Sequence, residues 1–371
     1  MTQSLDRGDM LFIGTYTTHG RGEGIYTYRF DHVSGALSHV RTLTGVQDPS
    51  FLAVHPNRRY LYATIEVRAY NGAAGGAVGA LAINPETGEL TPLGEQPSGG
   101  GDPCYVSLDA TGRFAFVANY SSGNVSAFPV GPDGRLGPAS DFVQHHGSGP
   151  NPQRQEGPHA HSIVPDPTNR YALVADLGLD RVMSYQLDLA QGKLKPNDPP
   201  YAEVAPGAGP RHIAFHPGGA WVYVSDELDS TVTAFQYDSA RGSLHPMQAL
   251  STLPEGWQAQ HTLPREVNYP AHVQVAPSGR FVYVSNRGHD STAVLAVDPA
   301  TGMLSSVGHQ STQGGYPRHF AIDPSGSWLL AANQNGDNVV VFHIDQATGQ
   351  LTPAGIEVHI PAPVCVRFLN G

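Results

Sequence analysis

Histidine and arginine recur at a fixed distance after proline in the second half of this chain. The segments GPRHIAF, YPAHVQV and YPRHFAI place His212, His272 and His319 two residues after their prolines. Arg211 and Arg318 directly precede two of these histidines. Imidazole groups exchange protons near neutral pH, and guanidinium groups bind carboxylates and phosphates in a planar fork. The pattern therefore predicts a site for acid–base chemistry on an anionic ligand.

This position belongs to a repeat that returns along the whole chain. Its anchor is a proline before a short strand, and successive anchors lie 46 to 60 residues apart, at Pro49, Pro103, Pro158, Pro210, Pro270, Pro317 and Pro363. The position two residues on reads Phe51, Tyr105, His161, His212, His272, His319 and Cys365, with His161 aligned through the strand HSIV that follows it. We expect four consecutive repeats to offer histidine here. Such histidines can equally be structural groups that hydrogen-bond between repeats.

A second ring of polar residues follows the second strand of each repeat. It reads Thr15, Thr64, Asn119, Asp176, Asp226, Asn286 and Asn333. Asn119 is a candidate ligand contact, although a repeated Asp or Asn after a strand also caps turns through the backbone. The next residues are Tyr16, Ile65, Tyr120, Leu177, Glu227, Arg287 and Gln334. Glu227 and Arg287 break the pattern on neighbouring repeats, and because buried charges need partners they are the stronger functional candidates.

The elements that position these residues are four short strands in each repeat. Four strands at a period of this length are typical of propeller blades. The chain begins inside a blade, with strands expected at 11–16, 24–30 and 36–43, and it ends on a single strand at about 363–369. We therefore expect an all-β, seven-bladed β-propeller of four-stranded antiparallel blades. The C-terminal strand would complete the N-terminal blade and close the ring, and residues 1–371 would form one propeller domain.

The candidate side chains should gather on one face of this ring. The loop that enters the first strand and the loop that leaves the antiparallel second strand share a face near the central axis. Two long loops, 144–162 and 251–270, enter first strands on that face, where long irregular loops often carry function. We expect them to cover a pocket, and the first contributes Arg154 and His159 as candidates.

Charge and composition limit the classes of partner. The net charge is −11 and no Lys/Arg run occurs, which argues against nucleic acid or an anionic membrane as partner. The start MTQSLDRGDM has no apolar core of a signal peptide, and no apolar run reaches membrane-spanning length. Cys104 and Cys365 lie on non-adjacent blades, so a disulfide is not expected, and no CxxC motif indicates a metal. A cytoplasmic protein without a cofactor, a metal or an obligate protein partner is the expectation.

Four segments carry a family resemblance: RQEGPHAHS at 154–162, GPRHIAFHP at 209–217, VSDELDSTVTAF at 224–235 and VSNRGHDS at 284–291. With them the chain resembles the seven-bladed lactonase family, which includes propeller-type 6-phosphogluconolactonase and the 3-carboxy-cis,cis-muconate lactonizing enzyme. The resemblance implies a catalytic set of one histidine, two arginines and one glutamate. These roles fall on His161, with His159 as the close rival, on Arg211 and Arg287, and on Glu227.

The resemblance implies metal-independent hydrolysis of a sugar-acid lactone at the channel mouth, with the arginines as a clamp for its anionic group. A base takes the proton of the attacking water, cations stabilise the oxyanion, and an acid protonates the leaving oxygen. Histidine suits the base role, and Glu227 would orient it or act as base itself. The remaining candidate substrate contacts are His159, His212, His272, His319, Arg318, Arg154 and Asn119. A lactonizing cycloisomerase, a metal-assisted lactonase and a non-catalytic binding scaffold are the alternatives.

Overall fold

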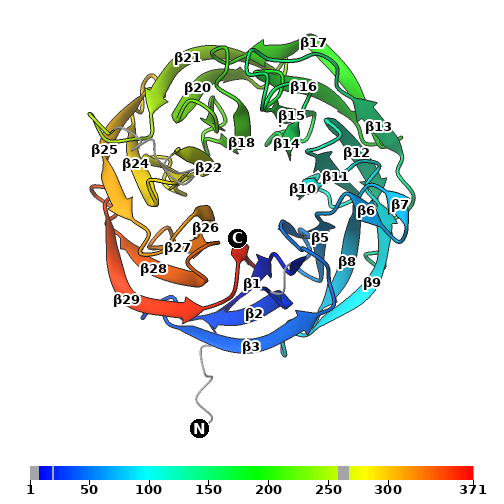
Figure 1. Cartoon of the computed structure of the whole chain (residues 1–371), viewed down its shortest axis with the longest axis horizontal. Helices are drawn as coiled ribbons and strands as arrows, with labels where there is room; N and C mark the ends of the chain where they lie inside the picture. Colours follow the sequence, from blue (N-terminus) through cyan, green and yellow to red (C-terminus); the bar gives the residue numbers. More distant parts are fainter. Residues whose placement is uncertain (1–7, 19–20, 258–266, 371) are drawn as a thin grey trace.

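Seven four-stranded antiparallel blades surround one axis in a computed structural model of the chain (Figure 1). The structure describes all residues except 1–7, 19–20, 258–266 and 371. The first blade joins both ends of the chain through β30 (Pro363–Phe368), β1 (Asp9–Thr15), β2 (Gly24–Phe30) and β3 (Leu37–Thr44). Leu11 of β1 pairs with Phe368 of β30, and Gly14 pairs with Cys365. The predicted closure of the ring by the C-terminal strand is thus confirmed, and it leaves no open inner edge.

The other six blades follow in chain order. The second blade contains β4 (Leu52–Val54), β5 (Tyr60–Ile65), β8 (Ala77–Ile83) and β9 (Leu90–Pro97), and the third contains β10 (Pro103–Leu108), β11 (Phe114–Asn119), β12 (Asn124–Pro129) and β13 (Asp141–Gln144). The fourth contains β14 (Ala160–Pro165), β15 (Tyr171–Asp176), β16 (Arg181–Asp188) and β17 (Lys193–Glu203). A small hairpin that the repeat does not predict, β6 (Ala69–Tyr70) with β7 (Ala73–Ala74), follows β5.

The last three blades repeat the pattern most regularly. The fifth contains β18 (Pro210–Phe215), β19 (Trp221–Asp226), β20 (Thr231–Asp238) and β21 (Ser243–Ser251), and the sixth contains β22 (Tyr269–Val275), β23 (Phe281–Arg287), β24 (Ser291–Val297) and β25 (Leu304–Ser311). The seventh contains β26 (Pro317–Ile322), β27 (Trp328–Asn333), β28 (Asn338–Ile344) and β29 (Leu351–His359). In the sixth blade, for example, the second and third strands are almost wholly buried and the fourth is largely exposed.

Neighbouring blades are fastened by a tyrosine in the second strand. The rings of Tyr62, Tyr223 and Tyr283 are fully buried, and their hydroxyls donate to the carbonyls of glycines in the next blade. The turn position needs glycine because its φ is positive, as at Gly302 with φ 73°, and because a Cβ there would lie 2.4 Å from the Trp221 ring. The same tyrosine thereby fixes the height of each second strand relative to its neighbours.

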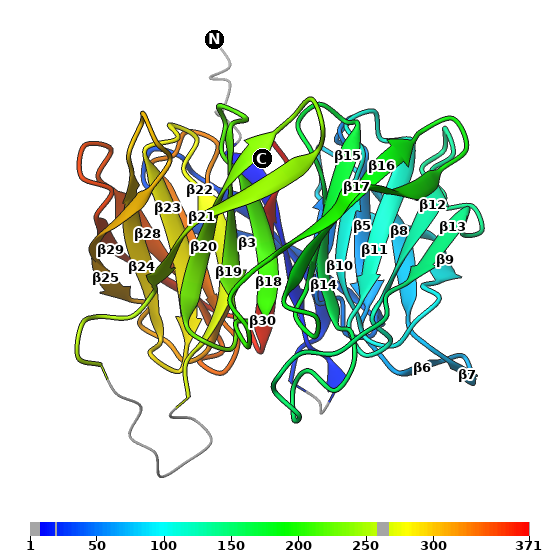
Figure 2. The ribbon, with the colours of Figure 1, turned by 90° about the horizontal axis from the view of Figure 1, so that it is seen from above.

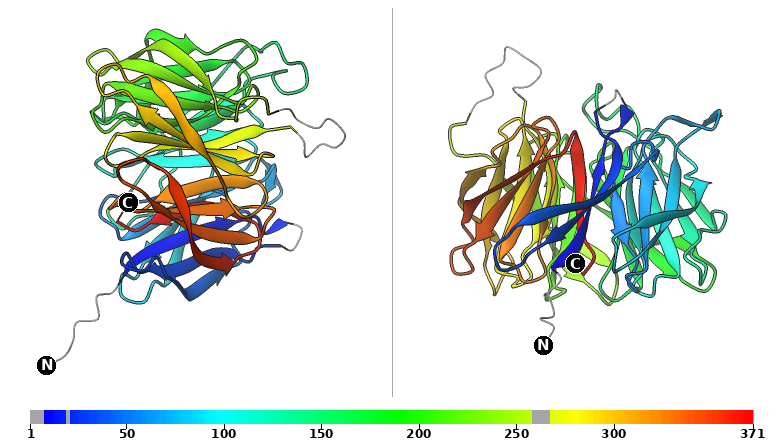
Figure 3. Two further views of the ribbon diagram at one scale, coloured as in Figure 1. Left: turned by 90° about the vertical axis from the view of Figure 1, so that its left-hand side faces the viewer. Right: turned by 90° about the horizontal axis from the view of Figure 1, so that it is seen from below.

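The loops that matter for the site leave one face of the ring. Figure 2 shows the β6–β7 hairpin and the long loop between β13 and β14 projecting from the same side. The C-terminus lies on the opposite side, as both views of Figure 3 show. No helix among the described residues is long and apolar enough to cross a membrane.

Candidate active site

A cavity of about 460 Å³ lies on the face where the first strands begin. Residues at or just after the ends of the second strands line it, among them Tyr16, Tyr120, Glu227 and Arg287. Their positions are equivalent: the backbone N–H of Glu227 donates to the carbonyl of the residue before the anchor proline, as those of Tyr16 and Tyr120 do. The backbone therefore brings the residues at the ends of the second strands to one face, as the sequence predicts.

A β-bulge near the start of the first strand turns a second set of side chains toward this face. In the third blade Pro103 pairs with Asn119 and Tyr105 with Ala118, so Cys104 is left without a partner across the ladder. The bulge residues are Cys104, His161, Arg211 and Arg318 in blades three, four, five and seven. Bulges re-aim side chains beside functional sites. Three of these side chains line the cavity, and Arg211 is buried at 1% exposure.

The strand pairing in blade four shows that the sequence alignment of His161 is wrong by one residue. Ala160 pairs with Asp176 and Ser162 with Ala175, so Ser162, not His161, shares the ladder position of His212. The prediction of histidine at one ring position in four consecutive blades is wrong by one residue in the fourth. Only three blades carry it, and His161 instead takes the bulge position that faces the cavity.

The bulge also places adjacent Arg211 and His212 on the same side of their strand. Strict alternation would point these side chains in opposite directions. The extra residue breaks that alternation, and Arg211 Nη1 lies 3.1 Å from His212 Nε2.

Glu227 is the centre of a cluster with three arginines. Arg154 Nη2 donates to Oε1 and Arg287 Nη2 donates to Oε2, both at 2.6 Å. Arg211 Nε lies 2.9 Å from Oε2 as an ion pair whose geometry is too poor for a hydrogen bond. Blades five and six and the loop before blade four thus converge on one carboxylate. Arg287 also lies over the Tyr316 ring, 5.2 Å from its centroid.

The three arginines keep the Glu227 carboxyl group ionised. Burial alone raises the pKa of the carboxyl, but Arg287, Arg211 and Arg154 together hold it well below its usual range. Burial lowers the pKa of Arg211 to about 9, so the guanidinium is still charged near neutral pH. Glu227 is therefore a permanent anion with both oxygens occupied. It is suited to hold arginines and poorly suited to accept a proton.

His161 faces the cavity as a neutral imidazole. Burial is the largest cause that lowers its pKa well below the ordinary value, and Arg211 adds to it. Nδ1 lies 3.6 Å from Cys104 Sγ, and the thiol is also 3.5 Å from the His161 carbonyl. Burial raises the pKa of the Cys104 thiol, so it is a protonated hydrogen-bonding neighbour and not an activated nucleophile. Cys365 is a second buried free cysteine.

His159, the rival of His161, is turned to other partners. Its Nδ1 lies 3.0 Å from the Tyr120 carbonyl, its Nε2 lies 3.5 Å from Glu156, and its ring stacks on Tyr120. The cavity lining drawn from the described residues includes His161 and omits His159. The loop 144–162 nevertheless reaches the cavity through Arg154, as the sequence predicts. Of the loop 251–270, residues 258–266 lie outside the described part of the chain.

Three histidines lie two residues after an anchor proline, namely His212, His272 and His319. They pack below the cavity and not in its wall. His212 Nδ1 lies 2.9 Å from His272 Nδ1, and the His272 and His319 rings stack at 3.9 Å. Phe51 and Tyr105 complete this aromatic layer, with Phe51 5.6 Å from His212. Burial lowers the pKa of all three imidazoles. The structural alternative, hydrogen bonding between blades, describes what His212 and His272 do.

Asn119 is likewise internal. It is fully buried, and its amide donates to the Ser98 carbonyl and to Asn124 Oδ1. Asn333 repeats these contacts with Thr312 and Asn338. These two asparagines therefore tie incoming loops to second strands, whereas Asp226 accepts hydrogen bonds from Thr231 and Thr233 of the third strand.

One functional candidate, Glu66, escaped the sequence comparison. The Glu66 N–H donates to the Asp48 carbonyl, which gives Glu66 the position of Glu227 in its own blade. The sequence alignment put Ile65 there and is wrong by one residue. The spacing from the buried tyrosine of the second strand would have given the correct alignment. Tyr62 lies four residues before Glu66, as Tyr223 lies four residues before Glu227.

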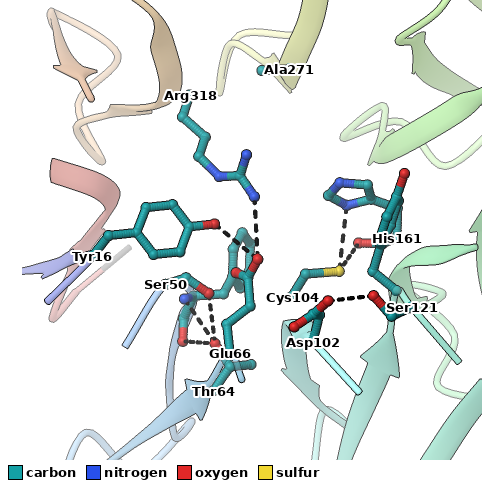
Figure 4. A network of polar contacts seen from close by, with 12 residues as sticks. Tyr16, Ser50, Thr64, Glu66, Asp102, Cys104, Ser121, His161, Ala271 and Arg318 are labelled. Carbon is teal, nitrogen blue, oxygen red and sulfur yellow. Dashed lines mark hydrogen bonds and ion pairs between the residues drawn. The ribbon is translucent and has the colours of Figure 1, made fainter. Parts of the chain in front are cut away.

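Glu66 lines the same cavity as Glu227 and lies beside Tyr16 and Arg318 (Figure 4). The Tyr16 hydroxyl donates to Glu66 Oε1 at 2.9 Å, and Arg318 Nη2 lies 3.7 Å from the same oxygen. Arg68 and Asp102 form a neighbouring ion pair at 2.8 Å. Among the residues that the structure describes, no group of three His, Cys, Asp or Glu is arranged to hold a metal.

Comparison with known proteins agrees with this architecture. Residues 10–368 match the family model described as lactonase, 7-bladed beta-propeller. The chain is 38% identical to a 6-phosphogluconolactonase of Bacillus subtilis, covering 97% of this chain and 98% of that one. It is 32% identical to a 6-phosphogluconolactonase of Formosa agariphila over 82% and 83% of the two chains. The periplasmic gluconolactonase of Pseudomonas aeruginosa superposes with a TM-score of 0.89 at 34% identity, covering 97% and 98%.

A closed seven-bladed ring with a charged cavity at one axial mouth defines the class of protein. The family match over nearly the whole chain makes the assignment specific. The chain belongs to the seven-bladed β-propeller lactonase family.

Proposed function

We propose that this protein hydrolyses the lactone of a sugar acid that carries an anionic group, with 6-phosphogluconolactone as the first substrate to test. Two of its relatives bear the name 6-phosphogluconolactonase. The observation that carries the proposal is the charge of the cavity. Arg68, Arg154, Arg287 and Arg318 line it against three carboxylates, and Arg211 lies beside them. A cationic cavity inside a chain of net charge −11 concentrates a small anion locally.

In this proposal the charged and the neutral groups have separate roles. Arg287 and Arg154, held by Glu227, would bind the phosphate or carboxylate and stabilise charge that develops on the carbonyl oxygen. His161, neutral and facing the cavity, would take a proton from the water that attacks the carbonyl carbon. Glu227 would act as the anchor of the arginines and not as the base, since both of its oxygens are occupied.

The experiment is a substrate panel on the purified full chain. Phosphorylated and unphosphorylated sugar lactones and a carboxymuconate would be offered with and without EDTA, with proton release from the lactones and proton uptake by the muconate as the readouts. We expect fastest turnover of a phosphorylated sugar lactone, unchanged by the chelator. Arg287→Ala should raise KM for that lactone, whereas Arg241→Ala, on the exposed rim, is the matched control. No turnover of any lactone overturns the proposal, and turnover of the muconate alone would indicate the cycloisomerase.

The location of the protein follows from the choice of substrate. Phosphorylated sugar lactones arise where sugar phosphates are kept, so the proposal places the enzyme in the cytoplasm. The structural relative named a periplasmic gluconolactonase shows that the fold also serves another compartment. Fractionation of the native host with an antibody decides between them, and a preference for the unphosphorylated lactone would favour the periplasmic alternative.

A further inference from the structure

The reaction proposed above needs an acid for the leaving ring oxygen as well as a base for water. Without protonation the ring oxygen would depart as an alkoxide, which is a poor leaving group. Glu227 cannot supply this proton because its pKa is held well below the usual range. His161 is the neutral partner that accepts a proton. A second carboxyl group in a different environment is therefore the feature to look for in the cavity.

Glu66 has the contacts that such an acid requires. It lines the cavity, and its Oε1 accepts the Tyr16 hydroxyl at 2.9 Å (Figure 4). Its Oε2 is buried and has no hydrogen-bond partner among the described residues. One oxygen is thus fixed, and the other is left for a partner that the protein does not provide. By contrast, both oxygens of Glu227 accept hydrogen bonds from arginine.

The charge around Glu66 opposes protonation less than the charge around Glu227 does. The cation paired with it, Arg318, lies 3.7 Å away and makes no hydrogen bond to it. Arg318 instead lies over the Tyr16 ring, 5.3 Å from the centroid. Burial raises the pKa of Glu66, and this effect outweighs the lowering by Arg318 and by the hydroxyls of Ser50 and Tyr16. Two titratable groups whose environments favour opposite proton states mark an acid–base pair.

We propose that Glu66 is a further catalytic residue, the general acid that protonates the leaving ring oxygen while His161 takes the proton of water. This inference rests on the proposed lactone hydrolysis. Water adds to the carbonyl carbon and gives its proton to His161. The bond from that carbon to the ring oxygen then breaks with its electron pair on oxygen, which takes the proton of Glu66. His161 afterwards loses its proton to solvent, and Glu66 regains one, so that the cycle closes.

Tyr16 is a positioning residue in this scheme, and Asp102 has the opposite electrostatic effect. The groups that face Glu66 are Tyr16 after β1, Ser50 before β4, Asp102 with its partner Arg68, Cys104 on β10 and Arg318 on β26. The Tyr16 hydrogen bond lowers the pKa of Glu66, and the negative charge of Asp102 raises it. Tyr16→Phe should therefore move the alkaline limb of the pH–rate profile to higher pH. Asp102→Asn should move it to lower pH.

The kinetic test compares Glu66→Gln with the wild type on the lactone that the panel identifies. Glutamine keeps the shape and cannot deliver a proton, so kcat should fall about 100-fold with little change in KM, a typical contribution of a general acid. The alkaline limb should disappear while the acidic limb of His161 remains. Glu95→Gln, on the exposed outer strand of the same blade, is the control and should behave as wild type. Wild-type kcat with both limbs in Glu66→Gln, or limbs unmoved in Tyr16→Phe and Asp102→Asn, overturns the inference.

A second readout does not depend on turnover. Infrared difference spectra of the full chain, titrated with pH, would show the carbonyl band of a protonated carboxyl that is missing in Glu66→Gln. The band should persist above the ordinary titration range of glutamate and shift upward in Tyr16→Phe. If no lactone is turned over but the band is present, the proposed reaction fails while the protonated Glu66 stands. If lactone is turned over and Glu66 titrates at its ordinary value, the inference alone fails.

Discussion

Glu66 and Glu227 occupy the same position in blades two and five, yet their surroundings give them opposite character. Each follows the second strand of its blade, and each donates its N–H to the residue before the anchor. Glu227 meets three arginines, and its pKa is held well below the usual range. Glu66 forms one long ion pair with an arginine and accepts a hydrogen bond from a tyrosine hydroxyl, and burial raises its pKa.

The residue after the anchor proline accounts for much of this difference. It is Arg211 in blade five and Ser50 in blade two. The neighbouring blade adds Arg287 beside Glu227, and the loop before blade four adds Arg154. The repeat thus sets where a carboxyl group lies, and the side chains of adjoining blades set its charge. Comparison of one blade with the next is informative only when the facing residues are compared as well.

The largest expected effect is the loss of stability when Glu227 loses its charge. Glu227→Gln leaves three arginines without an anion, and removal of one partner from a buried ion pair costs about 3–5 kcal/mol. The free energy of unfolding from urea denaturation should fall by that order. Glu66→Gln should cost clearly less because its ion pair is long. Equal losses in the two variants would contradict the contrast between the two carboxylates.

Replacement of His161 tests which histidine serves the cavity. His161→Gln should reduce kcat about 100-fold, a typical contribution of a general base, and His159→Gln should retain most of it. The pKa of His161 is lowered, so its neutral form persists as pH falls below the usual histidine range. The acidic limb of the wild-type rate should therefore lie below that range, and it should vanish in His161→Gln. A larger loss in the His159 variant would reverse the assignment.

A smaller effect is expected when the fork of Arg287 is replaced by a point charge. Arg287→Lys keeps the cation but loses paired donors to Glu227 and to the Tyr269 carbonyl. We expect kcat/KM to fall about tenfold, because a lysine replaces a guanidinium poorly at a multidentate site. Initial rates across substrate concentrations measure this. Arg241→Lys on the rim should leave kcat/KM at the wild-type value.

The smallest effect is expected at the buried cysteines. Burial raises the pKa of Cys104 and Cys365, so neither thiolate is available near neutral pH. Iodoacetamide should label neither cysteine in the folded protein by mass spectrometry, and both after denaturation. Rapid labelling of Cys104 that abolishes activity would show instead a reactive thiol in the cavity wall.

The sequence by itself determined the architecture and the face that carries the site. Regular spacing of the anchor prolines gave seven blades, and the unpaired strands at the two ends required β30 to close the ring with β1. Strand direction then brought Glu227 and Arg287 to one face, because antiparallel neighbours return to the side from which they start. These are consequences of chain periodicity, which a linear sequence displays directly.

Only the tertiary structure decided the details on which chemistry depends. The pairing between strands, which the sequence does not display, fixes the register of each blade, so the alignment displaced His161 and missed Glu66 by a single position. The charge states of Glu66 and Glu227 depend on arginines brought by other blades and by the loop before blade four. Such contacts join residues far apart in the chain, and their distances, burial and alignment arise only when the ring closes.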